Sequence, residues 1–457
     1  MKDIQTAQSI YCIGIGGIGV SALARLLHAE EKQVSGSDMN VSELTKQLQE
    51  EGIVVSYTQD GSALPADTEL VIFSDAVPED HPERKKAEEL GITQISYFQA
   101  VGEYAKQFDT VIAIAGTHGK STTTAMVANA LVAAGKNPTA IVGSLVTEFD
   151  RTNYRKGGKE LFVVEACEHQ AHFLHIVPDI VVITNIEADH LDFYSGIEHI
   201  TETFQKFVDQ MPETGTVILN ADDEYTMQLE ANSREMLSFG FAENSDIHAR
   251  NLRIKQQAQS FLVDDTIFVL DIPGDFNVSN ALGAISVARQ LEIDDDITKE
   301  SIASFNGVWR RFEVLGLYRK AIIVSDYAHH PTEIRKTIEA ARGFYPDRRI
   351  VVAFQPHQRE RTQALFQDFV EAVATADLLI IQEIYDVAGR EDEENTMNAQ
   401  TLIGAIEETG QFPMYSPNAE VTIDTIDDVL EKNDVVLIMG AGDIYKIAEE
   451  FEIDTSK

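Results

Sequence analysis

Two glycine-rich loops, each placed between an apolar run and an amphipathic stretch, constrain the fold of this chain most strongly. The first is IGIGGIG at residues 13–19, which follows SIYC and precedes VSALARLLHAEE. The second is GTHGKSTTT at residues 116–124, which follows DTVIAIA and precedes AMVANALVAAG. Strand, glycine loop and helix in this order predict βαβ units, a mostly parallel sheet and ligands at the carboxyl ends of the strands.

The same alternation continues along the chain and predicts an α/β protein with several domains. A chain of 457 residues has room for two to four domains at about 100–200 residues each. A third α/β unit follows NGVWRRFEVLG, with the expected strands KAIIVSDYA, RRIVVAFQ, DLLIIQEIY and DVVLIMGAG. The segment at about 244–271 alternates weakly and is expected to form a small antiparallel patch. The sequence therefore predicts three α/β units in series.

Composition excludes some classes of partner. The chain has 36 Lys and Arg against 75 Asp and Glu, a formal net charge of −39, which repels nucleic acid. A phosphate site must therefore be built locally. No apolar run reaches the roughly 18–20 residues that cross a bilayer, and the N-terminus lacks the features of a signal peptide, so we expect a cytoplasmic protein without membrane insertion. Cys12 and Cys167 lie in apolar strand-like runs and are expected to be buried thiols.

The second loop resembles a shortened Walker A motif and predicts a triphosphate site. Glycines let backbone N–H groups converge on phosphate at a helix N-terminus, Lys120 would neutralise phosphate charge, and the Ser121 hydroxyl would bind Mg²⁺. The expected ATP-binding residues of this loop are Gly116, Thr117, His118, Gly119, Lys120, Ser121 and Thr122.

Acidic and histidine side chains follow the next buried strands. Glu165 ends LFVVE and His190 closes NIEADH, so both are expected in the same crevice as the loop. With Ser121 they are candidate metal ligands. Asp189 and Asp192 lie nearby. The alternative for each of these side chains is a loop cap.

The first loop taken alone suggests a different protein, an NAD-dependent oxidoreductase. Asp38 follows Gly19 by 19 residues, where a ribose-binding acid is expected. That interpretation leaves the second loop unexplained. A P-loop binding or partitioning protein is another alternative, but it leaves HHPTEI (329–334) and FQPH (354–357) unexplained.

A longer set of motifs resembles the Mur ligase family, the ATP-dependent amide-forming enzymes of peptidoglycan synthesis. These motifs occur in the family's order and span nearly the whole chain. Besides the two loops they are VEACE (164–168), TNIEADHLDFY (184–194), FNVSNALGA (276–284), NGVWRRFE (306–313), DYAHHPTEI (326–334), FQPHQRERT (354–362) and MGAGDI (439–444).

The resemblance implies three domains. Residues 1–107 would form a Rossmann-like domain for the UDP-sugar, 108–313 the central P-loop ATPase domain, and 314–457 a C-terminal Rossmann-like domain that closes on ATP and the amino acid. It also implies the reaction: ATP phosphorylates the substrate carboxylate, an amine attacks the acyl phosphate, and phosphate leaves. Two Mg²⁺ ions would assist, one held by Ser121 and Glu165 and the other by Glu165 and His190.

The resemblance also implies roles for individual residues. Asn280 would read adenine, Arg311 would contact ATP phosphate and Asp326 would bind ribose. Lys120, His190 and His329 would be catalytic; a histidine side chain titrates near pH 6.5 and could take the amine's proton. His357 and Arg361 resemble the pocket for the amino-acid carboxylate, for which a guanidinium fork is suited. The UDP-sugar would lie on Gly14, Gly16, Gly17, Gly19, Asp38 and Ser74.

Within the family, GIGGIG, DYAHHPTEI and FQPH resemble the branch that joins L-alanine to UDP-N-acetylmuramate. The branch that recycles murein tripeptide is the alternative. Phe276 stands where many relatives have His, and Gln358 where many alanine-adding relatives have Arg. A monomer or a homodimer is expected.

Overall fold

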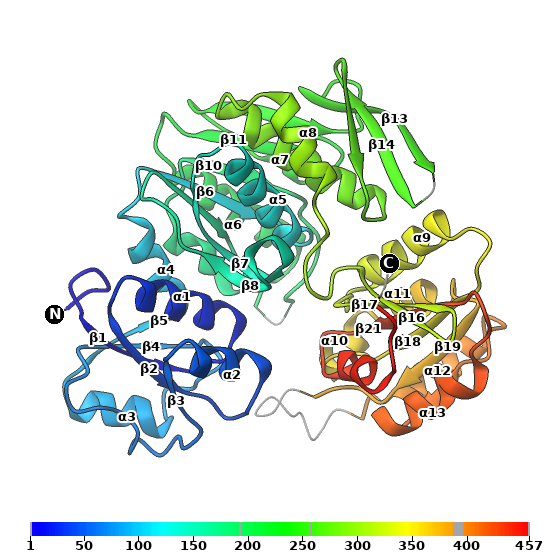
Figure 1. Ribbon diagram of the computed structural model, residues 1–457, viewed down its shortest axis with the longest axis horizontal. Helices are drawn as coiled ribbons and strands as arrows, with labels where there is room; N and C mark the ends of the chain where they lie inside the picture. The colour runs from blue at the N-terminus through cyan, green and yellow to red at the C-terminus, as the bar shows by residue number, and fades with distance from the viewer. Residues whose placement is uncertain (1, 192, 256, 387–395, 456–457) are drawn as a thin grey trace. The chain divides into compact units, whose positions relative to one another are not determined.

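The computed structural model describes residues 2–191, 193–255, 257–386 and 396–455. Helices and strands alternate along the chain and form three separate sheets (Figure 1). The mixed α/β architecture expected from the sequence is therefore confirmed. The chain divides into two compact units, one with Met1–Asn251, Phe261–Phe268 and Ser279–Phe305 and the other with Leu252–Ser260, Val269–Val278 and Asn306–Lys457.

The N-terminal sheet, drawn in blue in Figure 1, has the strand order β3-β2-β1-β4-β5, and its strand pairs are parallel. Its elements are β1 (Ser9–Ile13), α1 (Ile18–Ala29), β2 (Gln33–Ser37), α2 (Glu43–Glu50), β3 (Val54–Ser56), β4 (Leu70–Phe73), α3 (Pro82–Glu89), β5 (Thr93–Ser96) and α4 (Tyr97–Ala105). The strand order reverses between β1 and β4. A ligand crevice is expected at the carboxyl ends of these two strands.

The central sheet has the strand order β15-β14-β13-β12-β11-β10-β6-β9-β7-β8. Its first elements are β6 (Thr110–Ala115), α5 (Lys120–Ala133), β7 (Thr139–Val146), η1 (Thr147–Phe149), β8 (Thr152–Arg155), β9 (Leu161–Glu165), η2 (His169–His175), β10 (Ile180–Ile183) and α6 (Ile197–Asp209). Then follow β11 (Thr216–Asn220), η3 (Thr226–Gln228), β12 (Glu235–Gly240), β13 (Ile247–Lys255), β14 (Ala258–Val263), β15 (Thr266–Leu270), α7 (Asp275–Gln290) and α8 (Asp295–Ala303). Strands β13 to β15 occupy the segment for which a small antiparallel patch is expected, and they extend the central sheet beyond β12, with which β13 pairs in parallel.

The C-terminal sheet, yellow to red in Figure 1, has the order β16-β17-β21-β18-β19-β20, with β16 antiparallel at the edge. Its elements are β16 (Glu313–Tyr318), β17 (Ala321–Asp326), α9 (Pro331–Phe344), β18 (Ile350–Phe354), α10 (Arg359–Ala364), α11 (Phe366–Val373), β19 (Leu378–Gln382), α12 (Ala399–Glu407), β20 (Met414–Ser416), α13 (Ala419–Val429), β21 (Val435–Met439) and η4 (Ile444–Glu450). Strands β17, β21 and β18 are neighbours, so their carboxyl ends lie together.

The N-terminal and central sheets share one hydrophobic core. Leu27 of α1 and Tyr104 of α4 belong to the same buried cluster as Phe162 of β9. Arg25 crosses this seam: its side chain is buried and donates to Asn153 Oδ1 in β8 at 2.9 Å and to Glu51 Oε2 at 2.9 Å. The two sheets are therefore joined by both apolar packing and a buried polar bridge.

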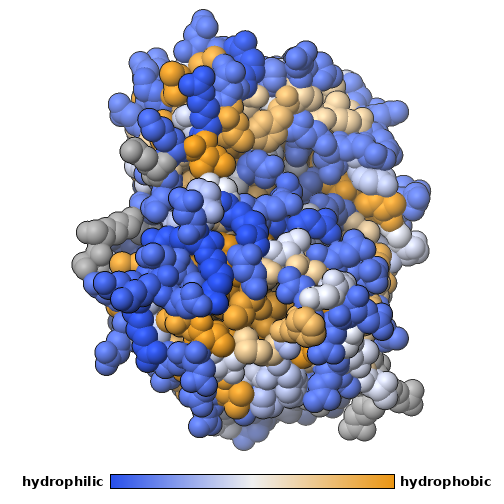
Figure 2. Space-filling view, turned by 90° about the vertical axis from the view of Figure 1, so that its right-hand side faces the viewer, coloured by the Kyte–Doolittle hydropathy of each residue, from blue (hydrophilic) through white to orange (hydrophobic). Residues whose placement is uncertain are grey.

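Hydrophilic residues cover much of the face shown in Figure 2, in line with the charged composition. Among the described helices, none is both long and apolar enough to cross a membrane. Cys12 is buried in β1 as expected, and burial raises the pKa of its thiol to about 12. The expectation for Cys167 is wrong: β9 ends at Glu165, and Cys167 lies beyond it, partly exposed.

Candidate functional site

The register of the central sheet brings three loop segments to one edge. Strand β6 lies between β9 and β10, with Ile114 paired to Glu165 and Ala115 paired to Ile183. The residues that follow β6 and β10, and the last residue of β9, therefore meet at the carboxyl edge. This is where the sequence placed the phosphate loop and Glu165.

The two glycines of this loop are required by backbone conformation and space. Gly116 has φ +134°, and a Cβ there would overlap the Thr184 hydroxyl. Gly119 has φ +84°, caps α5 at its N-terminus, and lies against the Asn280 side chain. Since residues with a Cβ rarely adopt such φ values, the loop needs glycine at both positions.

Two residues that follow β10 brace the loop. The backbone N–H of Thr117 donates to the Asn185 carbonyl at 3.0 Å, and that of His118 donates to Asn185 Oδ1 at 2.8 Å. The Thr184 hydroxyl donates to the His118 carbonyl at 2.5 Å. Sequence reasoning did not assign these residues a role, although TN directly follows a buried strand and was the available signal.

The start of α5 is suited to an anion. Lys120, Ser121 and Thr122 form its first turn, whose N–H groups have no acceptor within the helix. Such groups and the helix dipole favour phosphate. The Lys120 side chain folds back over the loop, where its Nζ donates to the carbonyls of Gly116 at 2.6 Å and Thr117 at 2.9 Å.

The same ammonium pairs with an acid that sequence reasoning missed. Lys120 Nζ lies 2.9 Å from Glu168 Oε2, and the two side chains are 13% and 4% exposed. Burial lowers the pKa of Lys120, but the negative charge of Glu168, with smaller contributions from Cys167 and Glu165, outweighs it and raises that pKa overall. Lys120 is therefore charged at neutral pH. The available signal was the second acid of VEACE.

Ser121 and Glu165 form the expected pair of hard oxygen donors. The Ser121 hydroxyl donates to Glu165 Oε2 at 2.8 Å, and the backbone N–H of Gly143 donates to the same oxygen at 2.8 Å. A hydroxyl and a carboxylate at the phosphate edge match the ligands that Mg²⁺ takes beside nucleotide phosphates. The donor set therefore fits Mg²⁺.

His190 lies beside Glu168. It has φ +54°, and its Nε2 is 3.7 Å from Glu168 Oε1 and 3.7 Å from Asp189 Oδ2. Its ring is 4.4 Å from that of His169, centroid to centroid. A second metal ion held by Glu165 and His190 stays a prediction, and Asp192 lies outside the described residues.

Hydrogen bonds donated by backbone N–H groups hold the first glycine loop in its conformation. Gly14 and Ile15 donate to the Ser37 carbonyl at 2.8 and 2.9 Å, and Gly17 donates to the Gly14 carbonyl at 3.1 Å. The Gly16 N–H donates to Asp38 Oδ2 at 2.8 Å. In this arrangement Asp38 holds the loop, and a diphosphate would meet the start of α1.

The remaining members of the expected UDP-sugar site lie around this loop. A Cβ on Gly14 would be 3.0 Å from the Ser74 Cβ, so the ends of β1 and β4 are in contact. A Cβ on Gly19 would be 2.5 Å from the Tyr97 ring, so α1 and α4 approach closely there. The predicted residues are thus gathered at the point where the strand order reverses.

Asn280 is buried beneath the phosphate loop. Its Oδ1 accepts from the Thr123 hydroxyl at 3.2 Å, besides lying against Gly119. In the described arrangement this oxygen supports the loop. Its expected contact with adenine stays a prediction.

In the second unit, Asp326 is buried at the end of β17. Its two oxygens accept the backbone N–H groups of Phe312 and Ala328, each at 2.7 Å. Burial raises the pKa of Asp326 to about 6, against the lowering effect of Arg311 and these N–H groups. A ribose hydroxyl would therefore have to share oxygens that already hold the backbone.

Two consecutive arginines have different surroundings. Arg311 Nη1 is 3.4 Å from Glu333 Oε1, and its guanidinium lies 5.0 Å from the Tyr327 ring centroid. Arg310, which sequence reasoning did not select, is buried, stacks on Tyr445 and donates to the Gly440 carbonyl. Arg310 therefore supports the loop after β21.

The two histidines before α9 also differ. His330 is the helix cap: its Nδ1 accepts the Thr332 N–H at 3.3 Å, and Pro331 follows as the first helical residue. His329 Nδ1 is 3.2 Å from the Tyr327 carbonyl and 3.1 Å from Glu333 Oε2. With the proton assigned to Nδ1, the Nε2 of His329 is an acceptor, as a general base requires.

The expected amino-acid residues lie after β18. The His357 ring stacks on Tyr385 at 5.6 Å and lies 6.3 Å from the His329 ring, both between centroids. Arg361 lies one helical turn further on, in α10, which begins after Gln358 with φ +67°. The structure thus brings His329 and His357 together.

Family models match three consecutive segments of the chain, in the order expected for the N-terminal, central and C-terminal domains. The chain matches "Mur ligase family, catalytic domain" over residues 9–109, "Mur ligase middle domain" over 114–288 and "Mur ligase, glutamate ligase domain" over 310–442. It is 37% identical to the UDP-N-acetylmuramate–L-alanine ligase of Caldanaerobacter subterraneus, covering 100% of this chain and 99% of that protein. It is 38% identical to the enzyme of the same name from Clostridium novyi, covering 97% of each.

Solved structures agree. The UDP-N-acetylmuramate-alanine ligase MurC of Thermotoga maritima matches with a TM-score of 0.83 at 28% identity, over 97% of both chains. A murein peptide ligase of Psychrobacter arcticus matches with a TM-score of 0.72 at 22% identity, over 97% of this chain and 98% of that one, which shows a shared fold. With the phosphate loop, its acidic neighbours and all three domain matches in one order, the chain belongs to the Mur ligase family.

Proposed function

We propose that this chain is an ATP-dependent ligase that joins L-alanine to the carboxylate of UDP-N-acetylmuramate through an acyl phosphate, in peptidoglycan precursor synthesis. The single observation that carries the proposal is the phosphate loop with Lys120 over it and the Ser121–Glu165 pair beside it. Full-length relatives named for this reaction support the choice of substrates. We further propose that the enzyme is cytoplasmic and acts as a monomer or homodimer.

The loop supplies what phosphoryl transfer needs, which is positioning and neutralisation of charge. The N–H groups at the start of α5 would hold the β- and γ-phosphates, and Lys120 would follow the charge as it moves to the leaving oxygen. Ser121 and Glu165 would hold Mg²⁺. When bound, the ion would supply positive charge at the phosphate oxygens and acyl oxygen.

The C-terminal unit would supply the second half-reaction. Arg361 and His357 would bind the carboxylate of the amino acid. The amine of the bound amino acid would then point toward His329. The Nε2 of His329 would accept the amine's proton, since Nδ1 is held by Tyr327 and Glu333. The amine can then attack the acyl carbon, and phosphate leaves.

ADP release across a panel of amino acids tests the proposal. With ATP, Mg²⁺ and UDP-N-acetylmuramate, release should be slow until L-alanine is added. Glycine and L-serine measure selectivity, since one methyl or hydroxyl group is worth about 1–3 kcal/mol. Release with L-alanine absent but the murein tripeptide present would instead identify a recycling ligase. Release that needs no sugar nucleotide would contradict both.

A further inference from the structure

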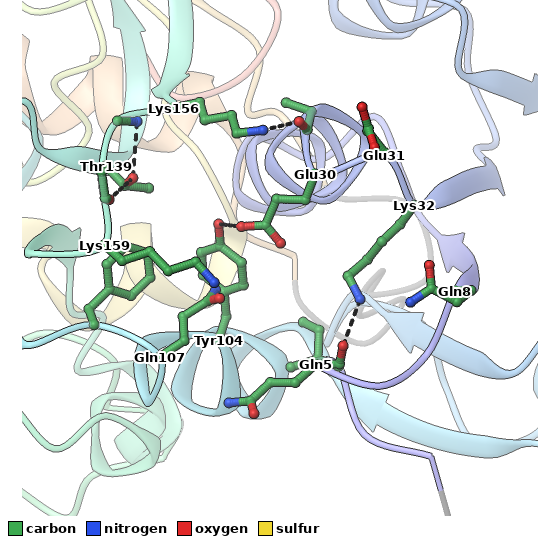
Figure 3. Close-up of a pocket in the computed structure, with 15 residues that line it drawn as sticks. Gln5, Gln8, Glu30, Glu31, Lys32, Tyr104, Gln107, Thr139, Lys156 and Lys159 are labelled. Atoms are coloured by element: carbon green, nitrogen blue, oxygen red, sulfur yellow. Dashed lines mark hydrogen bonds between the residues drawn. The ribbon is translucent and has the colours of Figure 1, made fainter.

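A second pocket lies at the seam between the N-terminal and central sheets. It encloses about 590 Å³, within the range of small-molecule sites. It is lined by the chain before β1, the end of α1, α4, the residues before β6 and the 156–159 segment (Figure 3). No proposed substrate residue lines it.

This pocket lies on the side of both sheets opposite the glycine loops. Gln8 and Phe108, which line it, precede β1 and β6, whereas the loops follow these strands. At about 3.3 Å per residue, strands of five and six residues separate the two sides by roughly 16–20 Å. A ligand here would therefore not occupy the substrate crevice.

The lining has an unusual charge balance for this chain. Three lysines, Lys32, Lys156 and Lys159, line it with two acids, Glu30 and Glu31. The whole chain has about twice as many acidic as basic residues, 75 against 36. Positive charge is thus gathered at a hollow on an otherwise acidic protein.

Backbone carbonyls hold two of the three lysines in the lining of the pocket. Lys32 is buried, and its Nζ donates to the carbonyls of Gln5 at 3.0 Å and Ala7 at 2.7 Å, which leaves one N–H of the ammonium. Lys156 donates to the Ala29 carbonyl. Figure 3 shows Lys159 reaching toward the Gln107 side chain.

Neighbouring charged groups act on Lys32 in both directions. Burial lowers the pKa of Lys32, and the positive charge of Lys159 adds a smaller lowering effect, whereas the carboxylates of Glu30, Asp3 and Glu69 oppose both. One carboxylate oxygen of Glu30 already accepts from the Tyr104 hydroxyl at 2.8 Å. A bound anion would relieve the repulsion between the lysines.

We propose that this pocket binds a small phosphate-bearing metabolite, as an effector site separate from the phosphate loop. Lys159 and Lys32 are its charge partners. The ligand would contact α1 of the N-terminal domain and the 156–159 segment of the central domain at once. Its occupancy would therefore stabilise the seam between these domains.

Calorimetric titration of the full chain with inorganic pyrophosphate tests this, without Mg²⁺ and with the phosphate loop first saturated with ADP and the first glycine loop with UDP. One binding event should remain. Lys159→Glu should weaken it at least tenfold, whereas the matched change Lys255→Glu, on exposed β13, should leave it unchanged.

Two results would overturn the proposal: no binding to the ADP-saturated protein, or equal affinities for Lys159→Glu and Lys255→Glu. Lys120→Ala gives an independent arm, because it removes the loop lysine but should keep this event. Ligase activity of Lys159→Glu without pyrophosphate should match that of the unmodified chain, which separates this proposal from the assigned reaction.

Discussion

Glu168→Gln should make the enzyme less stable and at the same time tighten its binding of ATP. In the described structure, Glu168 is the counter-ion of Lys120 at 2.9 Å. A nucleotide's phosphates would take over this role when they occupy the loop. The carboxylate thus competes with ATP for one ammonium.

The expected magnitude follows from the burial of the pair. The two side chains are 13% and 4% exposed, and removing one partner of a buried pair costs about 3–5 kcal/mol. If bound phosphate restores half of a cost of about 4 kcal/mol, nucleotide affinity rises by about 2 kcal/mol, or roughly thirtyfold in Kd.

Thermal unfolding with and without a non-hydrolysable ATP analogue measures both effects. The Tm of Glu168→Gln should fall, and the rise in Tm on adding the analogue should be larger than for the unmodified chain. Glu168→Asp keeps the charge, and Glu213→Gln changes an exposed acid, so both should show smaller effects. An equal loss of Tm in the free and nucleotide-bound states would refute the competition.

Three further outcomes are expected. Lys120→Ala should reduce phosphate release to background, because the ammonium is needed in the transition state; near-normal turnover would remove it from the ATP site. Arg361→Ala should mainly raise the KM for the amino acid in initial-rate assays, and an unchanged KM would exclude the carboxylate contact. Burial, with His169 and His175, lowers the pKa of His172 to about 4, below the unfolded value of about 6.5. The stability that neutral, buried His172 contributes should therefore be present above pH 6.5 and lost as pH falls toward 4. Urea unfolding at pH 7 and pH 5 should show that the free energy of unfolding falls more for the unmodified chain than for His172→Phe. Equal decreases for the two proteins would contradict this.

The parts of the site that follow from strand and loop order could be predicted from the sequence. A buried strand, a glycine loop and a helix place Ser121 at a sheet edge, and the next buried strand brings Glu165 to the same edge. Because parallel strands end at the same edge of a sheet, Ser121 and Glu165 meet there whatever rotamers their side chains adopt. The 2.8 Å contact between the two residues agrees with that reasoning.

Side-chain partnerships could not be predicted in the same way. The Lys120–Glu168 pair and the Asn185 brace depend on rotamers and on turns after the strands, which periodicity does not determine. The sequence predicts Asp38 as a ligand residue but not the hydrogen bond that its carboxylate accepts from the Gly16 N–H. The sequence predicts Cys167 in a strand because apolar residues continue after Glu165, but strand β9 ends at Glu165.

The shared core of the first two sheets bears on how such enzymes can be recombined. A chimera that imports residues 1–107 from a relative must present a surface that fits β8 and β9 of the retained domain, including an arginine at position 25 that can donate to Asn153. The UDP-sugar site proposed for the N-terminal domain therefore cannot be exchanged as an independent module. On this proposal, we expect substitutions at the crevice to be tolerated more readily than substitutions at the seam, where Arg25 donates to Asn153.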